Sequence, residues 1–503
     1  MQIVRYILPA LCGLILSMSV SAVPASTPPS ANTPMNILFI FCDDLGWFDL
    51  GSYGSTFYET PNIDRLAREG MRFINAYASS NVCSPSRASV MTGKYPSRVG
   101  LTQYLGGHNV GQLCDVPYFD RLPASEYTLA SALKDRANYQ TWHVGKWHLG
   151  EWKSRPEAHG FEINIAGCER GGPGRVGYFS PWNNAFPNLP DREDGENLTD
   201  RLNEEAIRLI RERDPTRPFY LNYWPYAVHT PLQAPEPLIE KYREKARRLG
   251  LDQEEDNEII GEMETLSHLG KPIHRRKFQN HPVYAAMVEN LDTNIGLLIE
   301  ALESEGLMEN TLIVFSSDNG GLATGESFPT HNGPLSEGKG WMYEGGVREP
   351  LIAYCPGVVP SGVASDALTI TPDFYPTFLE FAGLDPLPHQ HVDGVSIAPI
   401  LRGERQTFDR GPVFWHYPHY SNQGGKPASA IREGDWKLIQ FYEDGQVELY
   451  NLADDLGEQH NLADAEPAIR DRLERQLQNW IEATHALIPQ HNSNWPPTAF
   501  AHP

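Results

Sequence analysis

Acidic and amide side chains stand directly after two apolar runs that are typical of buried β-strands. Asp43 and Asp44 follow the first run, and Asp318 and Asn319 follow the second. In open α/β sheets, ligands bind outside the carboxyl ends of the strands, and adjacent carboxylates there need a cation or strong donors to offset their repulsion. Carboxylate and amide oxygens are hard ligands, so the pattern favours Ca²⁺ or Mg²⁺ over zinc. The alternative is two turn-forming Asp/Asn pairs, which commonly end strands.

Basic side chains follow further predicted strands. Lys146 and His148 lie two positions apart in extended sequence, so their side chains point the same way and could bind an anion and transfer a proton. His229 follows another apolar run. Lys339 lies between two glycines, which allow close approach of the backbone to a ligand. Each of these residues, taken alone, has a structural interpretation that is at least as common.

The charge of the chain limits its partners. It has 64 acidic residues against 41 Lys and Arg, a formal net charge of -23. Such a surface favours solubility and disfavours nucleic acid or anionic lipid as a partner. If the substrate is an anion, the basic residues must be concentrated in its pocket.

The first 22 residues are typical of an export signal. Arg5 gives a positive start, an apolar stretch follows, and Val20-Ser21-Ala22 resembles a small-residue cleavage site. Residues 23–34, rich in Pro, Ser, Thr and Ala, are expected to form a flexible leader. The apolar stretch is short for a membrane span, so we expect a periplasmic or secreted protein with no membrane anchor. A buried N-terminal helix is the alternative, which Pro9 opposes.

The cysteines divide by their surroundings. One of the six leaves with the export signal, and Cys42 and Cys355 end apolar runs, where buried strand cysteines are common. Cys114 and Cys168 lie in loop-like sequence and could form a disulfide in an exported protein. Cys83 is left without a structural role.

The chain must place these residues on an α/β framework. Strands that alternate with helices predict a large mixed, mostly parallel sheet sandwiched by helices, over residues 35–405. The expected strands include 35–42, 140–144, 219–224, 311–316 and 350–354, and the expected helices include 62–69, 128–136, 197–214, 236–249 and 283–303. Residues 250–281 are polar and resemble an insertion.

After about residue 405 the pattern changes. Short strands are expected at 412–417, 428–432, 436–442 and 446–451, with Asp444-Gly445 as a hairpin turn. A helix is expected at 465–484. We therefore predict a smaller C-terminal α+β subdomain at 406–490, with an antiparallel sheet and one helix, and then a tail at 491–503.

The string around Cys83 is more specific than these patterns. Cys83-Ser84-Pro85-Ser86-Arg87, followed by Thr92-Gly93, resembles the C-x-P-S-R and T-G signature of the formylglycine-dependent sulfatases, arylsulfatase-like enzymes of the alkaline phosphatase superfamily. Residues 139–150 are similar to the second family signature. The acidic pairs, His229 and the stretch 338–348 follow in family order, so the resemblance spans residues 35–460.

The resemblance implies a mechanism. In the family, a maturation enzyme oxidises the signature cysteine, here Cys83, to formylglycine (3-oxoalanine), whose hydrate attacks sulfur. A second hydroxyl then allows sulfate to leave, an exit that plain Ser or Cys lacks. The implied ligands of Ca²⁺, favoured over Mg²⁺, are Asp43, Asp44, Asp318, Asn319 and residue 83. The implied catalytic residues are Cys83, Arg87 to stabilise the hydrate, Lys146 and Lys339 to bind sulfate oxygens, His229 as general acid, and His148 and Asp318 as proton acceptors.

The alcohol half of the substrate is less defined. The segments 104–120, 168–190, 326–334 and 416–420 are rich in aromatic, His, Asn and Gly residues, which suit a sugar ring or ordinary loop packing. Trp224, His331 and His416 are the candidate substrate contacts. With the export signal, we predict action on a sulfated polysaccharide or its oligosaccharides, of carrageenan, ulvan or glycosaminoglycan type.

Three other functions have to be weighed. Some phosphodiesterases and phosphonate monoester hydrolases of the same superfamily also use formylglycine. A non-catalytic glycan-binding protein on this fold would not need the intact Cys83, Arg87 and Lys146. Transfer of sulfate to another acceptor is the third alternative, as a minor activity.

Overall fold

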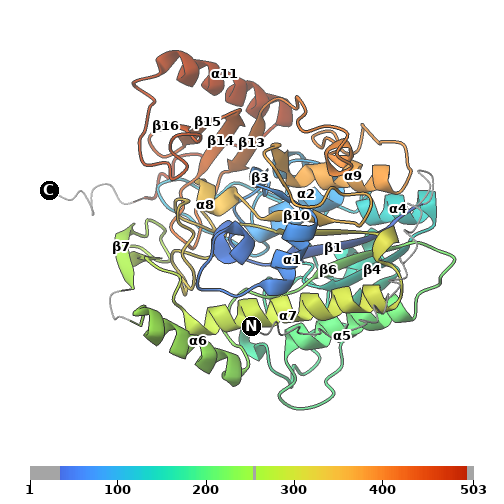
Figure 1. Cartoon of the computed structure of the whole chain (residues 1–503). Coiled ribbons are helices and arrows are strands. Elements are labelled where there is room, and N and C mark those ends of the chain that lie inside the picture. The colour runs from blue at the N-terminus through green and yellow to red at the C-terminus, as the bar shows by residue number, and fades with distance from the viewer. Residues whose placement is uncertain (1–33, 253–255, 496–503) are drawn as a thin grey trace, which may run out of the picture.

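A computed structural model of the chain describes residues 34–252 and 256–495 (Figure 1). The predicted export signal, nearly all of the leader and most of the predicted tail therefore lie outside the described residues. In the part that is described, no helix has both the length and the apolar character needed to cross a bilayer.

The main sheet has eight strands in the order β11-β2-β10-β9-β1-β6-β4-β5. They are β1 (Asn36–Cys42), β2 (Met71–Phe73), β4 (Gln140–Gly145), β5 (Ile163–Ile165), β6 (Phe219–Trp224), β9 (Thr311–Ser317), β10 (Leu351–Tyr354) and β11 (Val363–Ser365). β1 lies near the centre, parallel to β6 and β9. β10 runs antiparallel to both β9 and β2, whereas the other neighbouring pairs are parallel. The predicted mixed, mostly parallel sheet is confirmed.

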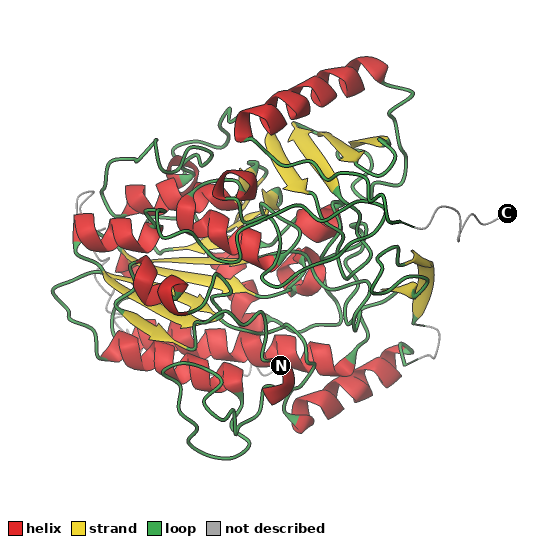
Figure 2. Cartoon of the chain, turned by 180° about the vertical axis from the view of Figure 1, so that it is seen from behind, coloured by secondary structure: helices red, strands yellow, loops and turns green. Residues whose placement is uncertain are grey.

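Helices cover both faces of this sheet, as Figures 1 and 2 show. One layer holds α1 (Pro61–Glu69), α5 (Leu198–Arg211), α6 (Glu236–Leu249) and α7 (Pro282–Ser304), and the other holds α2 (Cys83–Thr92), α4 (Leu129–Ala137), α9 (Phe374–Phe381) and α10 (Ala398–Leu401). Two short helices, α3 (Pro96–Val99) and α8 (Glu344–Val347), lie in connecting segments.

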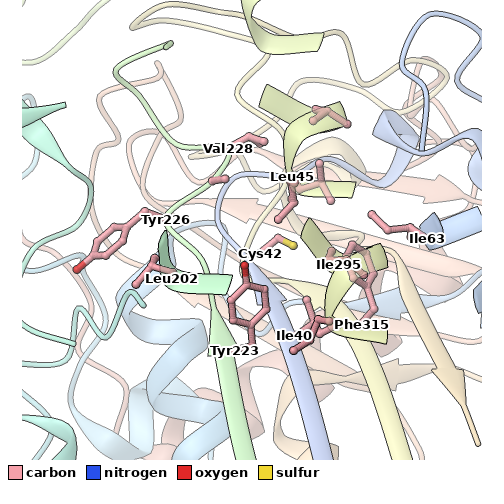
Figure 3. Packing of buried hydrophobic residues seen from close by; sticks show 14 of the residues in the cluster. Ile40, Cys42, Leu45, Ile63, Leu202, Tyr223, Tyr226, Val228, Ile295 and Phe315 are labelled. Atoms are coloured by element: carbon pink, nitrogen blue, oxygen red, sulfur yellow. The ribbon is translucent and has the colours of Figure 1, made fainter. Parts of the chain in front are cut away.

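Alternate side chains of β1 enter the two layers because successive residues of a strand point to opposite faces. Ile40 and Cys42 pack in one cluster with residues of α5 and α7 (Figure 3). Phe39 and Phe41 belong to the opposite cluster, where Phe39 contacts the Phe378 ring of α9 at 5.3 Å between centroids. All seven residues of β1 are buried, so its carboxyl end is held rigidly where the site residues begin.

A second sheet follows the main one in the chain. Its strands β13 (Val413–Tyr417), β14 (Ala428–Glu433), β15 (Trp436–Phe441) and β16 (Val447–Asn451) pair antiparallel in sequence order, and α11 (Pro467–Thr484) packs against them. The turn between β15 and β16 contains Asp444-Gly445, with Gly445 at φ 74°. The predicted antiparallel sheet with one helix is confirmed.

Two small strand pairs complete the fold. β3 (Ala76–Tyr77) pairs with β12 (Thr369–Ile370), and β7 (Asn257–Glu262) pairs with β8 (Pro272–Arg276). The second pair lies in the polar segment 250–281, for which the sequence indicated no strand. The side chains of β7 are exposed or half-buried, so this strand shows no core-facing alternation.

A buried ionic cluster joins the C-terminal sheet to the main domain. Lys437 of β15 is fully buried and lies 2.9 Å from both Glu344 of α8 and Glu458. Arg348 donates to the other oxygen of Glu344 at 2.6 Å, and the Tyr77 hydroxyl donates to the same oxygen. The segment after Lys339 is thereby fixed against the second sheet.

We expect Lys437→Met to lower the free energy of unfolding by about 3–5 kcal/mol, because it leaves buried carboxylates without their partner. Lys241→Met is the matched control: Lys241 also pairs with two carboxylates, Glu59 and Glu289, but its side chain is 39% exposed. There we expect about 1 kcal/mol or less. Urea unfolding of both variants checks this, and equal losses would contradict a special contribution of the cluster.

Candidate active site

The predicted site residues meet at the carboxyl ends of neighbouring strands. Asp43 and Asp44 follow β1, Lys146 and His148 follow β4, His229 lies beyond β6, Asp318 and Asn319 follow β9, Cys83 begins α2, and Lys339 precedes α8. Because β4, β6, β1 and β9 are consecutive in the sheet, segments far apart in sequence converge on one point. Cys83 is 3% exposed there.

Cys83 and Arg87 lie one helical turn apart on α2, so both side chains face the site. The Arg87 guanidinium is fully buried and donates from Nε to Oδ2 of Asp318 at 2.8 Å. It also lies over the rings of Phe41 and Trp224, 5.6 and 5.2 Å from their centroids. The expectation that Trp224 contacts substrate is wrong: its ring is fully buried beneath Arg87.

Each carboxylate of the site is paired with one cation. Lys146 Nζ donates to both oxygens of Asp43, at 2.7 and 2.8 Å. Lys339 Nζ donates to Oδ2 of Asp44 at 2.8 Å, and Asn319 donates to the other oxygen of Asp44, also at 2.8 Å. With Arg87 on Asp318, three negative and three positive charges balance in a buried volume.

Burial acts to raise the pKa of each acidic group of the site. It raises the pKa of the Asp43 carboxyl, although Lys146 opposes the shift, and it raises the pKa of Asp318 against the effect of Arg87. At Asp44, burial also acts to raise the pKa, but Lys339 and His229 outweigh it and hold the pKa well below its ordinary value. Burial raises the pKa of the Cys83 thiol despite Lys146 and Lys339.

These residues form a set that fits a divalent cation. Oxygen and sulfur atoms of Asp43, Asp318 and Cys83 lie within 4.8 Å of one another, as do ligand atoms of Asp43, Asp44 and His229. Oδ1 of Asn319 is buried and has no hydrogen-bond partner among the described residues. A cluster of buried oxygen donors with an unsatisfied amide oxygen has the chemistry that Ca²⁺ or Mg²⁺ requires.

The two histidines lie on the same side of the site. His229 contacts the carbonyl of Thr230 through Nδ1 at 2.8 Å, and its Nε2 lies 3.6 Å from Asp44. Burial first, and then Lys339, lower the pKa of His229 to about 4. Burial and the charge of Lys146 also lower the pKa of His148, whose Nδ1 has no partner in the described chain. Both rings are therefore neutral in the free site at pH 7.

A loop between β5 and α5 packs against both imidazoles. A Cβ atom on Gly171 would lie 2.7 Å from Cε1 of His148, and one on Gly172 would lie 2.7 Å from Nδ1 of His229. These distances are shorter than any side chain can tolerate without movement of the neighbour. The lack of side chains at these two glycines therefore lets the loop lie directly against both imidazole rings. Sequence spacing did not indicate this role.

The possible Cys114–Cys168 disulfide is not formed, because both cysteines are free. Cys168 is buried in the loop that carries Gly171 and Gly172, with its sulfur 3.8 Å from the Tyr226 hydroxyl. Cys114 lies in another loop, where its amide donates to the carbonyl of Gln490.

An open pocket of about 700 Å³ lies over Cys83. Its lining includes His148, His229 and Lys339 from the site, and Tyr104, Arg170, Gly171, Glu326 and Asn422 from surrounding loops. The other two candidate substrate contacts lie elsewhere. His331 lines a different pocket. His416 is buried between Ser429 and the Leu487 carbonyl, so the expectation that it contacts the substrate directly is wrong.

Comparison with known proteins identifies the family. The family model described as Sulfatase matches residues 35–384, and that described as N-sulphoglucosamine sulphohydrolase, C-terminal, matches residues 337–485. The chain belongs to the sulfatase family. This sulfatase is 32% identical to a sulfatase of Formosa agariphila, over 95% of this chain and 93% of the relative.

Other similar proteins carry more specific names. The sulfatase is 33% identical to human N-acetylgalactosamine-6-sulfatase, over 77% of this chain and 69% of the relative. Its fold matches the crystal structure of Ps i-CgsB in complex with k-i-k-neocarrahexaose, with a TM-score of 0.71 and 27% identity over 93% of this chain and 96% of that one. The sulfatase is thus a sulfuric ester hydrolase, as predicted.

Proposed function

We propose that this sulfatase removes sulfate from a sulfated polysaccharide or its oligosaccharides, through a formylglycine made from Cys83 and a bound Ca²⁺. The observation that carries the proposal is the open pocket over Cys83, which is lined by Lys339 and both histidines of the site and by loop residues that include Tyr104 and Asn422. Its volume of about 700 Å³ suits a sugar with part of its neighbour. Among the similar structures, Ps i-CgsB holds a carrageenan oligosaccharide.

Modification of Cys83 would solve a chemical problem of the site. Burial raises the pKa of its thiol, so the unmodified side chain is a poor nucleophile at neutral pH. The aldehyde hydrate supplies two hydroxyls on one carbon, one to attack sulfur and one whose deprotonation expels sulfate. Arg87, fixed by Asp318 and two aromatic rings, stabilises the hydrate from the next helical turn.

The remaining residues bind sulfate and move protons. Asp43 and Asp44 hold Lys146 and Lys339, whose charges both act on residue 83. The two lysines bind sulfate oxygens as point charges. His229 protonates the leaving alcohol oxygen, and the negative charge of a bound sulfate ester raises the pKa of this ring from its low value in the free site. His148 accepts the proton that accompanies release of sulfate.

Asp43, Asp44, Asp318 and Asn319 are the proposed protein ligands of Ca²⁺, together with the modified residue 83. When bound, the ion acts as a Lewis acid toward the sulfate oxygens and orients the nucleophile. The unsatisfied Oδ1 of Asn319 and the clustered carboxylates support this assignment.

Export and maturation belong to the same proposal. The signal-like residues 1–22 indicate a periplasmic or secreted enzyme. A formylglycine-generating enzyme would have to act on Cys83 before folding ends, because the folded chain buries this residue at 3% exposure.

A panel of defined oligosaccharides, each with one sulfate at a known position, tests the function. We expect release of sulfate from a restricted subset, which identifies the sugar and the ester position. The same enzyme should hydrolyse aryl sulfates faster than aryl phosphates or phosphonate monoesters. A clear preference for phosphate or phosphonate would replace the proposal by the alternative from the same superfamily.

We expect His229→Ala to lower kcat for a sugar sulfate by about 10²–10⁴-fold, because an alkoxide needs a proton to leave. The loss should be much smaller for 4-nitrocatechol sulfate, whose phenolate leaves unprotonated. Gly172→Ala, which pushes the ring away, should give the same pattern at up to about 10²-fold. His331→Ala, a histidine of another pocket, is the control. Equal losses on both substrates would refute the role of general acid.

A further inference from the structure

The loop that carries Arg170 is fixed by the catalytic residues themselves. The carbonyl of Cys168 accepts a hydrogen bond from the backbone N–H of His148 at 2.8 Å. The Tyr226 hydroxyl donates to the carbonyl of Ala166 at 2.9 Å. With Gly171 packed directly against His148, the loop has little freedom to move away from the site. The position of Arg170 is therefore tied to the reacting centre.

Arg170 differs from every other cation of the pocket. Arg87, Lys146 and Lys339 each have a carboxylate partner within the site. The Arg170 side chain lines the pocket beside His148 and His229, yet no ion pair or hydrogen bond joins its guanidinium to another residue in the described ranges. Glu169 precedes it in the chain, but no carboxylate of the described residues forms an ion pair with the Arg170 guanidinium, so its positive charge is available to a ligand.

A second loop brings a carboxylate to the same pocket. Glu326 lines it and accepts a hydrogen bond from Gln423 at 2.8 Å. Next to it, Asn422 donates to the Tyr104 hydroxyl at 2.7 Å. This carboxylate repels an anionic group and suits sugar hydroxyls as donors. The pocket lining therefore contains both a group that attracts a second negative charge, Arg170, and a group that repels it, Glu326.

We propose that Arg170 is a specificity residue that binds a second anionic group of the substrate. The group is a carboxylate or a second sulfate on the sugar next to the one that bears the reacting ester. A guanidinium is suited to both because its planar fork can donate two parallel hydrogen bonds. The inference rests on the proposed carbohydrate substrate and adds that the substrate carries more than one negative charge near the cleaved ester.

The test compares matched substrates. Two oligosaccharides carry the preferred sulfate ester with, respectively, a neighbouring uronic acid or a neighbouring sulfated sugar, and two counterparts carry a neutral sugar in that place. The rate of loss of the parent oligosaccharide gives kcat/KM for the wild-type enzyme, Arg170→Gln and Arg175→Gln. Arg175 is the matched control, since it lies on the same loop, is exposed and does not line the pocket.

We expect the wild-type enzyme to prefer a substrate with the second anionic group, and the arm in which the preference appears identifies a carboxylate or a sulfate. Arg170→Gln should lower kcat/KM on that substrate by about 10- to 100-fold, the size of a charge-assisted contact. It should change the neutral counterpart little, and Arg175→Gln should match the wild type on all four. Unchanged melting temperatures would exclude misfolding as the cause.

Two results would overturn the inference. One is a wild-type enzyme with no preference in either arm, and the other is an Arg170→Gln variant that loses activity equally on charged and neutral counterparts. Failure of the proposed function is distinguishable: the wild-type enzyme would then release sulfate from none of the oligosaccharides while still cleaving an aryl sulfate, and both proposals would fall.

Discussion

Cys83→Ala lowers kcat for sulfate release by at least about 10³-fold and leaves the fold intact. The expected loss is large because, among the described residues, Cys83 is the one cysteine that lines the pocket, close to Lys339. The small effect on folding follows from the position of residue 83 at the first turn of α2, where alanine keeps the helix. Released sulfate and the melting temperature measure the two effects separately.

Two further variants distinguish a nucleophilic residue at position 83 from a cysteine that only packs in the core. Cys355→Ala, a buried cysteine just after β10, should keep its kcat. Cys83→Ser should also be inactive, because one hydroxyl cannot both attack sulfur and expel sulfate. Mass spectrometry of the wild-type peptide should show residue 83 lighter by the change from thiol to aldehyde. Full activity with an unmodified thiol would exclude the formylglycine mechanism.

The residues at the strand ends could be predicted from sequence because two independent patterns agreed on them. A buried strand such as β1 is a continuous apolar run, and its first polar residues, Asp43 and Asp44, mark the carboxyl end. Parallel pairing then requires that such ends meet at one edge. The family signature added Cys83 and Arg87, which no periodicity indicates.

The walls of the pocket could not be predicted in the same way. The segments expected to contact substrate do contribute Tyr104, Arg170 and Glu326 to the lining, but composition cannot tell which side chain of a loop points inward. Trp224 was misleading because it ends a strand near the site, yet alternation turns it into the core beneath Arg87. His416 lies in β13, and alternation there directs it to Ser429.

Charge balance decides how the enzyme should respond to removal of the proposed Ca²⁺. Asp43, Asp44 and Asp318 are neutralised by three cations of the chain, so the site without an ion is buried but not strongly repulsive. A bound Ca²⁺ adds two positive charges to this balance and gives the pocket floor the net charge that attracts a sulfate ester. The ion should therefore matter greatly for activity and only modestly for the fold.

We expect EDTA to abolish nearly all sulfate release, by at least about 10²-fold, because several kcal/mol of charge stabilisation are lost. The melting temperature should fall by only about 2–3 °C, which is the change expected when a ligand present at a concentration about a hundred times its Kd is removed. Addition of Ca²⁺ should restore both, and titration of kcat against free Ca²⁺ measures the affinity. Chelator-resistant activity in protein shown to be metal-free would remove the ion from the proposal.

Asp318→Asn and Asp49→Asn separate ligation from general effects of a buried carboxylate. Both aspartates are fully buried and close to the site, but Asp49 is already satisfied by Thr330, Tyr284 and Gln279 and lies outside the ligand cluster. We expect Asp318→Asn to raise the half-saturating Ca²⁺ concentration at least about tenfold, and Asp49→Asn to leave it unchanged. An equal rise of the half-saturating Ca²⁺ concentration in both variants would mean that Ca²⁺ affinity depends on the buried negative charge of the region in general. A rise confined to Asp318→Asn would mean that Ca²⁺ binds at the carboxylate that also accepts a hydrogen bond from Arg87.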